Sequence, residues 1–148
     1  AHDLRNGDLY LIGVVRDRFS EADTINALVQ QIYVHKPQIV GIERSAFKAE
    51  VVRRIAAAVR SRVLVNITDV QPLEDKVARA RLPALWGGQG KSFADHNAPW
   101  YPDFIAEALG FPNTTYKDQV DAYSLATYML SVISMQQGRG EVETGDPD

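Results

Sequence analysis

Cysteine is absent from this sequence, so disulfide bonds and thiolate metal sites are excluded. No run reaches the roughly 18 apolar residues that a membrane-spanning helix needs, so we expect no membrane contact. The polar, charged N-terminus also lacks the pattern of a signal peptide. These absences are typical of a protein that works in a reducing cytoplasm.

Several familiar catalytic patterns are missing as well. The histidines His2, His35 and His96 are scattered and show no metal-ligand spacing. The stretch 86–92 contains glycines and a Lys-Ser pair, but it lacks the spacing of a phosphate-binding loop. No serine lies in a nucleophile elbow. The sequence therefore does not support an ATP site or serine-hydrolase chemistry.

The length of the chain indicates one domain, and its charge distribution shows a locally basic segment. The chain has 148 residues, 45% of them hydrophobic, which is enough to form a core. The formal net charge is −3, and residues 139–148 account for it with one Arg against four acidic residues. Residues 44–91 carry ten Lys or Arg against four Asp or Glu, a net of +6. This basic segment is either a phosphate-facing surface or a solvated helix face.

Apolar periodicity and turn signals predict helices and strands that alternate along the chain. Asn6-Gly7 is a strong hairpin signal, and residues 9–15 have the composition of a buried strand. Ser20 with Asp23 is an acidic variant of the capping box, and Pro37 ends the helix that Ser20 begins. The further elements that we expect are strands at 38–43 and 63–67, and helices at 47–59, 73–85 (broken or ended by Pro83), 102–109 and 118–135.

Other segments are expected to lack regular structure. A flexible loop is predicted at 86–90 and a second loop at 110–117. Residues 136–148 are polar, Gly-rich and acidic, so we expect a disordered tail after a domain of residues 1–135. A hairpin followed by alternating helices and strands is typical of an α/β fold with a mixed sheet. The face of the last helix that we expect to pack consists of Ala122, Leu125, Ala126, Met129, Leu130 and Ile133.

Three acidic residues are the strongest candidates for a functional site. Asp118 and Asp121 lie three residues apart at the start of the last predicted helix, so both face the same side. Glu43 follows the apolar run 39–42, at the end of a strand where open α/β sheets place their ligands. Carboxylate oxygens suit Mg²⁺ and Mn²⁺, so the pattern favours a site for divalent metal ions.

Each of these acids also has a structural explanation. Asp118 could cap the helix, and Asp121 could be a first-turn acid that the helix dipole favours. Glu43 could pair with Arg44 or with another basic residue. The three positions together favour a metal site, although the spacing alone is not specific.

The order of several segments resembles a known family. The segments are Asn6-Gly7 with LYLIGVVRDRFS, then IVGIERSAF, DKVARA, APWYPDFIAEALGFPN and DQVDAYSLA. They resemble the C-terminal nuclease domain of phage large terminase subunits, and the resemblance runs from about residue 3 to residue 134. It implies a ribonuclease H-like fold, in which a mixed sheet is flanked by helices.

The resemblance implies a metal-dependent endonuclease that cuts concatemeric double-stranded viral DNA during packaging. Two metal ions, Mg²⁺ or Mn²⁺, about 3.5–4 Å apart would activate a water and stabilise the leaving oxygen. Glu43 matches the family's second acid, Asp118 the acid that starts the final helix, and Asp121 the acid three residues later. The implied partners are a terminase ATPase domain, a small terminase subunit and a portal, in the bacterial host cytoplasm of a phage or prophage.

DNA contacts are expected from the basic segment 44–91. Phosphate contacts position a duplex without specifying its sequence, so we expect cleavage with little sequence preference. The residues expected to make these contacts are Arg44, Lys48, Lys76, Arg79 and Arg81.

The sequence departs from the family pattern in two places. Lys117 stands where the family often has an acid, so the site is less negative. The family's first acid lies on a strand before the hairpin, and we expect this first strand to be absent here. Asp3 and Asp8 flank the turn at the wrong end of the hairpin to replace that acid. Two alternatives stay open: a catalytically incomplete remnant that binds DNA or a protein partner, and a resolvase-like nuclease.

Overall fold

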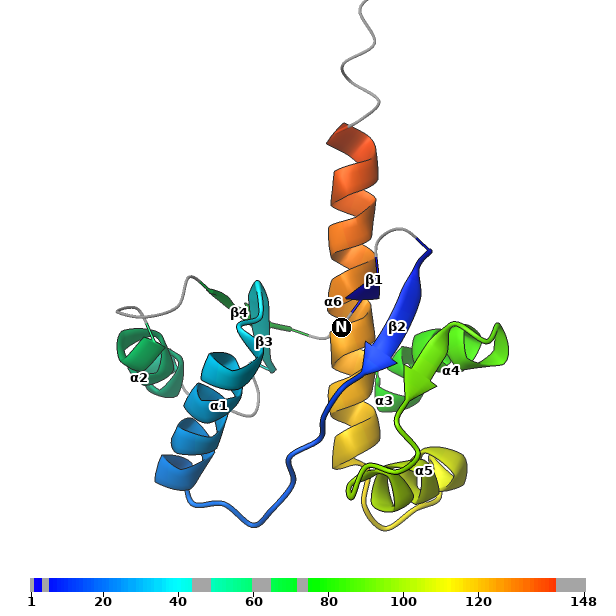
Figure 1. Ribbon diagram of the computed structural model, residues 1–148, viewed down its shortest axis with the longest axis horizontal. Coiled ribbons are helices and arrows are strands. Elements are labelled where there is room, and N and C mark those ends of the chain that lie inside the picture. The colour runs from blue at the N-terminus through cyan, green and yellow to red at the C-terminus, as the bar shows by residue number, and fades with distance from the viewer. Residues whose placement is uncertain (1, 4–5, 44–48, 60–64, 72–74, 141–148) are drawn as a thin grey trace, which may run out of the picture. The chain divides into compact units, whose positions relative to one another are not determined.

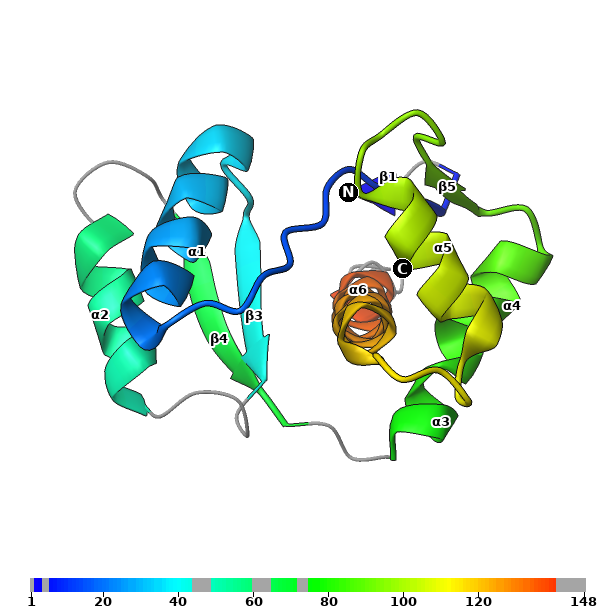
Figure 2. The same ribbon diagram turned by 90° about the horizontal axis from the view of Figure 1, so that it is seen from below.

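The computed structural model describes residues 2–3, 6–43, 49–59, 65–71 and 75–140. It confirms a mixed α/β structure, whose helices and strands are labelled in Figures 1 and 2. The chain divides into two compact units. Unit 1 consists of Ala1–Val14 and Glu74–Asp148, and unit 2 consists of Val15–Leu73.

Unit 1 contains a three-stranded mixed sheet. Strand β2 (Asp8–Leu11) lies between β1 (His2–Asp3), to which it is antiparallel, and β5 (Ser92–Ala94), to which it is parallel. The predicted hairpin at Asn6-Gly7 is confirmed. Gly7 has a φ of 73°, which glycine adopts without a steric penalty, and the Asp8 amide donates to Asn6 Oδ1 at 2.9 Å.

The described part of unit 1 also contains four helices: α3 (Lys76–Arg79), α4 (Arg81–Gly88), α5 (Tyr101–Gly110) and α6 (Asp118–Gly140). The first three all pack against α6, as Figures 1 and 2 show. The rings of Phe104 and Tyr123 meet edge to face between α5 and α6, with centroids 5.6 Å apart. Helix α6 is thus the element that organises this unit.

Unit 2 packs two helices on a parallel strand pair. Helices α1 (Glu21–His35) and α2 (Ala49–Val59) lie beside strands β3 (Ile39–Glu43) and β4 (Asn66–Val70), as Figure 2 shows. The predicted start of α1 is confirmed, because Ser20 Oγ accepts from the Asp23 amide at 3.2 Å. The buried core of this unit consists of Ile25, Ile32, Ile42, Val51, Ile55 and Val59.

The strands differ from the prediction in extent and in pairing. The described strands form two sheets, the mixed sheet of unit 1 and the β3–β4 pair of unit 2, where one mixed sheet was predicted. Strand β2 ends at Leu11 rather than at residue 15, and Ile12 and Val15 are exposed. Strand β4 begins at Asn66, because its pairing with β3 sets the register, whereas residues 63–67 were predicted. Residues 60–64 lie outside the described residues.

The helices after β4 also differ from the prediction. The break falls at Ala80, between α3 and α4, and not at Pro83. Pro83 sits in the first turn of α4, where a missing amide hydrogen costs no helical hydrogen bond. Helix α4 continues through Gly88, into the segment predicted as a loop. Packing of α4 against α6 offsets the low helix propensity of these glycines.

Helix α6 is longer than predicted, and the predicted packed face is confirmed only in part: Leu125 is buried, and Met129, Leu130 and Ile133 are half-buried. It continues to Gly140, five residues past 135, and the remainder of the predicted tail, 141–148, lies outside the described residues. Ala122 and Ala126, predicted to pack, are exposed. Ser124 and Thr127 are buried instead, because their hydroxyls donate to helix carbonyls, those of Val120 and Ser124, and so need no water.

Candidate site at the start of helix α6

The start of α6 is held by a carboxylate from α5. Glu107, only 5% exposed, accepts from the Val120 backbone amide through Oε1 and from Gln119 Nε2 through Oε2, both at 2.9 Å. An amide of the first helical turn is the group that an N-cap side chain normally satisfies. Glu107 therefore caps the start of α6. The sequence had allowed this capping role for Asp118.

The side chain of Asp118 is left available by this arrangement. Asp118 is the first residue of α6 and is exposed. Within the part of the chain that the structure describes, no group donates a hydrogen bond to its carboxylate or forms an ion pair with it. Asp118 thus presents a carboxylate with its oxygens open to a ligand.

Asp121, one turn further along α6, has a different environment. Its carboxylate is 9% exposed and contacts two cations from α3. Lys76 Nζ lies 2.7 Å from Oδ2, and a terminal guanidinium nitrogen of Arg79 contacts Oδ1. Both oxygens of Asp121 are therefore engaged by positive groups of the protein itself.

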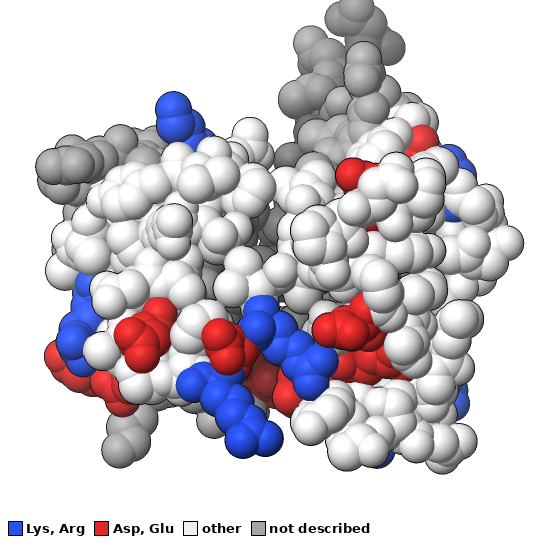
Figure 3. Space-filling view, turned by 60° about the horizontal axis from the view of Figure 1, so that its bottom comes forward, with Lys and Arg blue, Asp and Glu red and all other residues white. Residues whose placement is uncertain are grey.

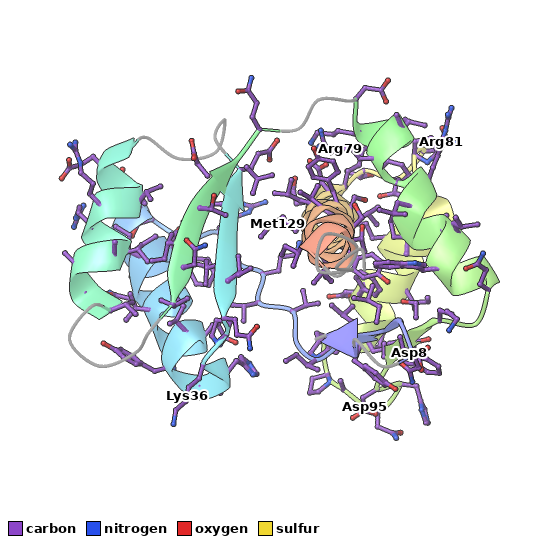
Figure 4. All side chains as sticks on the ribbon, turned by 90° about the horizontal axis from the view of Figure 1, so that it is seen from above. Asp8, Lys36, Arg79, Arg81, Asp95 and Met129 are labelled. Carbon is purple, nitrogen blue, oxygen red and sulfur yellow. The ribbon has the colours of Figure 1, made fainter. Side chains whose placement is uncertain are left out.

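Helix α3 delivers these two cations from one face. Asp75 caps it by accepting from the amides of Val77 and Ala78, both at 2.9 Å. Lys76 and Arg79 lie three residues apart and so project from the same side. Arg79 is buried, with 8% of its side chain exposed, and Figure 4 shows it beside α6, while Lys76 keeps 54% of its side chain exposed.

The charges around Asp121 set its protonation. Burial acts to raise the pKa of Asp121, but hydrogen bonds and positive charge from Lys76 and Arg79 outweigh the effect of burial. The pKa therefore lies below its ordinary value of 3.8. Asp121 is an ionised counter-ion at neutral pH.

Glu43 belongs to unit 2, at the carboxyl end of β3. Its neighbour Ile42 is in the helix-packed core, and successive strand residues point to opposite faces, so Glu43 faces away from that core. Among the described residues none pairs with the Glu43 carboxylate, and Arg44 lies outside them. A site that joins Glu43 to the start of α6 stays a prediction.

The predicted DNA contacts fall into three groups. Arg44 and Lys48 lie outside the described residues. Lys76 and Arg79 are engaged with Asp121. Arg81, labelled with Arg79 in Figure 4, is exposed at the start of α4, and no described acid pairs with it.

Basic residues elsewhere in the segment 44–91 also have acidic partners. Arg53 pairs with Glu50 at 2.7 Å, and Arg54 pairs with Glu21 at 3.1 Å. The face drawn in Figure 3 accordingly displays acidic as well as basic side chains. Partner acids reduce the field that these cations present, so within the segment 44–91 Arg81 is the described residue best suited to meet a phosphate.

Two of the three predicted metal ligands keep carboxylates that a metal ion could use, and the third does not. No group of three or more Asp, Glu or His side chains among them is arranged to hold a metal ion. Asp118 and Glu43 keep open oxygens of the type that Mg²⁺ and Mn²⁺ prefer, but the oxygens of Asp121 are occupied by Lys76 and Arg79.

Sequence reasoning missed two polar features of unit 1. Glu107 interrupts the apolar face of α5 three residues after buried Phe104, and a charged residue at such a position is the signal that could have revealed it. The second is the hydrogen bond between Ser92 on β5 and Tyr123 on α6, which ties the sheet to the helix. Burial raises the pKa of Tyr123, and the smaller effect of Ser92 lowers it.

Comparisons with known proteins add no relative. The chain matches no protein-family model, no curated protein and no solved structure. Of the helices in the described ranges, none combines the length and the apolar character needed to cross a membrane.

Proposed function

We propose that this chain is a metal-dependent endonuclease domain of the terminase type, which cuts concatemeric double-stranded DNA. The observation that carries the proposal is the pair of open carboxylates at Asp118 and Glu43. These are two of the positions that the sequence resemblance assigns to metal ligands, and neither has a described partner. The proposal includes a ribonuclease H-like fold as the finer form of the α/β class.

The proposed cofactor is Mg²⁺ or Mn²⁺, in a two-ion site. Glu43 and Asp118 are its proposed ligands, because carboxylate oxygens without competing donors suit hard divalent cations. Asp121, the third acid that the resemblance assigns, supports the proposal less well, because Lys76 and Arg79 hold both of its oxygens.

The proposed substrate contact uses exposed cations near the start of α4. Arg81 has no described acidic partner, and Lys76 keeps about half of its side chain exposed while it pairs with Asp121. Contacts from such residues to backbone phosphates position DNA without reading its sequence. Cleavage with little sequence preference is the corresponding expectation.

The family resemblance also suggests protein partners and a cellular location for this chain. The proposed partners are a terminase ATPase domain, a small terminase subunit and a portal, in the cytoplasm of a bacterial host of a phage or prophage. Co-purification of the chain with the ATPase domain of its own large subunit tests this part separately from the chemistry.

The direct test of the proposal is nicking of supercoiled plasmid DNA in Mn²⁺ and in Mg²⁺. We expect nicked and linear products that EDTA abolishes, and Glu43→Gln is expected to lower the rate at least tenfold because it removes a proposed ligand charge. The matched control is Glu50→Gln, since Glu50 is an exposed acid of the same unit whose described partner is Arg53, at 2.7 Å. Cleavage that persists in EDTA would refute the proposal.

A catalytically incomplete DNA-binding or partner-binding domain is the second candidate. It is favoured by the occupied oxygens of Asp121 and by the lack of a three-ligand cluster among the described residues. Duplex binding without cleavage in any divalent metal would select this candidate. Cleavage of branched DNA in preference to linear duplex would instead indicate a resolvase-like nuclease.

A further inference from the structure

The contact between α3 and α6 is an ion triad with a buried centre. Asp121 and Arg79 are 9% and 8% exposed, and Lys76 completes the triad from the solvent side at 2.7 Å. A buried guanidinium needs a counter-ion, because removal of one partner from a buried pair leaves an uncompensated charge in a poorly solvated place. The carboxylate of Asp121 serves Arg79 as a counter-ion.

A metal ion at Asp121 would compete with these cations. Coordination needs a carboxylate oxygen, and Oδ1 and Oδ2 are contacted by Arg79 and Lys76 respectively. Lys76 could turn into solvent, since its side chain is 54% exposed, but Arg79 has no comparable route. A cation bound at Asp121 would therefore place a second positive charge beside the buried guanidinium of Arg79.

Asp118, three residues earlier on α6, carries none of these constraints. It is exposed, and no described residue bonds to its carboxylate. The amide that it could have capped is already satisfied by Glu107. Two acids that look equivalent in the sequence are thus different in structure: one is engaged and buried, and the other is open.

We infer that Asp121 is the internal counter-ion that fixes α3 to α6, and that the metal-binding carboxylate at this end of α6 is Asp118. The first half concerns the fold alone, and the second half rests on the proposed function. The family resemblance places these two residues together in one ligand set, whereas their environments in the structure differ.

The test combines thermal unfolding with Mn²⁺ titration calorimetry on four proteins: wild type, Asp118→Asn, Asp121→Asn, and the double variant Arg79→Met/Asp121→Leu. Asp121→Asn is expected to lower the Tm by about 10 °C, because it removes the charged carboxylate that pairs with the buried Arg79 guanidinium. The double variant removes both charges, so we expect its Tm to stay within about 3 °C of wild type. It lacks the Asp121 carboxylate and is expected to keep the fold, so its affinity for Mn²⁺ shows whether Asp121 is a metal ligand.

For Mn²⁺, the double variant is expected to bind as wild type does, within about threefold, while Asp118→Asn loses at least tenfold in affinity at unchanged Tm. A folded double variant that loses tenfold in affinity would overturn the inference, as would an Asp121→Asn protein with the wild-type Tm. If wild type binds no Mn²⁺, the proposed function fails. The Tm values of Asp121→Asn and of the double variant then still decide whether Asp121 is the counter-ion.

Discussion

The Glu107 carboxylate accepts a hydrogen bond from the backbone amide of Val120 at 2.9 Å, so a residue of α5 caps the first turn of α6. Its second oxygen accepts from Gln119, also at 2.9 Å. The capping group therefore comes from a packed neighbour rather than from the residue before the helix. This contact fixes where α6 begins, and hence where Asp118 is presented.

Glu107→Ala is expected to destabilise unit 1 by about 1–3 kcal/mol, because a buried amide and a buried side-chain donor lose their acceptor. Glu107→Gln is expected to cost less, since its carbonyl can still accept from Val120. Chemical denaturation measures both. Asp103→Asn, an exposed acid on the same helix, is the control and is expected to change stability by less than about 0.5 kcal/mol. A Glu107→Ala protein as stable as this control would contradict the capping role.

Acid stability is expected to depend on Asp121. Its pKa is lowered in the folded protein from the ordinary value of 3.8, so below about pH 4 the unfolded chain takes up this proton more readily than the folded chain. The stability that Asp121 contributes is therefore fully present above about pH 4 and is lost as the pH falls through the lowered folded pKa. Tm measured from pH 6 to pH 2 should fall less steeply in Arg79→Met/Asp121→Leu than in wild type. Identical slopes would rule out this linkage.

Alkaline stability is expected to depend on Tyr123. Burial raises its pKa above 10.0, so the folded protein holds the phenolic proton more tightly than the unfolded chain does. The corresponding stability is present below about pH 10 and is lost as the pH rises through the raised pKa. Tyr123→Phe should reduce this alkaline loss in pH-dependent unfolding. The exposed Tyr116→Phe serves as the control and should leave it unchanged.

Arg81 is expected to contact DNA phosphate. Arg81→Ala should weaken duplex binding similarly for all sequences and lower the slope of log affinity against log salt by about one. Arg54→Ala is the matched control, because that guanidinium already donates to Glu21 at 3.1 Å. Fluorescence anisotropy with duplexes of two unrelated sequences measures both effects. An equal loss in the two variants would show that Arg81 has no special part in binding.

Local signals in the sequence predicted much of the secondary structure. Ser20 and Pro37 bracket α1 because capping and proline geometry act within a few residues. The Asn6-Gly7 turn and the strand that ends at Glu43 were predicted for the same reason. Strand β5 was missed, because three residues carry little periodicity and their strand character comes from pairing with β2.

At the candidate site, too, local sequence spacing predicted the positions of the residues, whereas contacts with distant residues determine their environments. The spacing of Asp118 and Asp121 placed both on one helix, as the structure confirms. Their different environments depend on residues far away in sequence: Arg79 is 42 positions from Asp121, and Glu107 is 13 positions from Val120. A pattern within one segment carries no information about such distant partners. The sequence therefore could not predict that Asp121 is buried in an ion triad while Asp118 is exposed.

The proposed nuclease function is tested most directly at Asp118. The measurement is the rate of Mn²⁺-dependent nicking of supercoiled plasmid by Asp118→Asn, compared with Asp103→Asn, which neutralises an exposed acid in the first turn of α5. We predict that Asp103→Asn cuts at the wild-type rate and that Asp118→Asn is slower by at least a hundredfold, with both proteins folded. Equal rates for the two variants would contradict the proposal that Asp118 holds a catalytic metal.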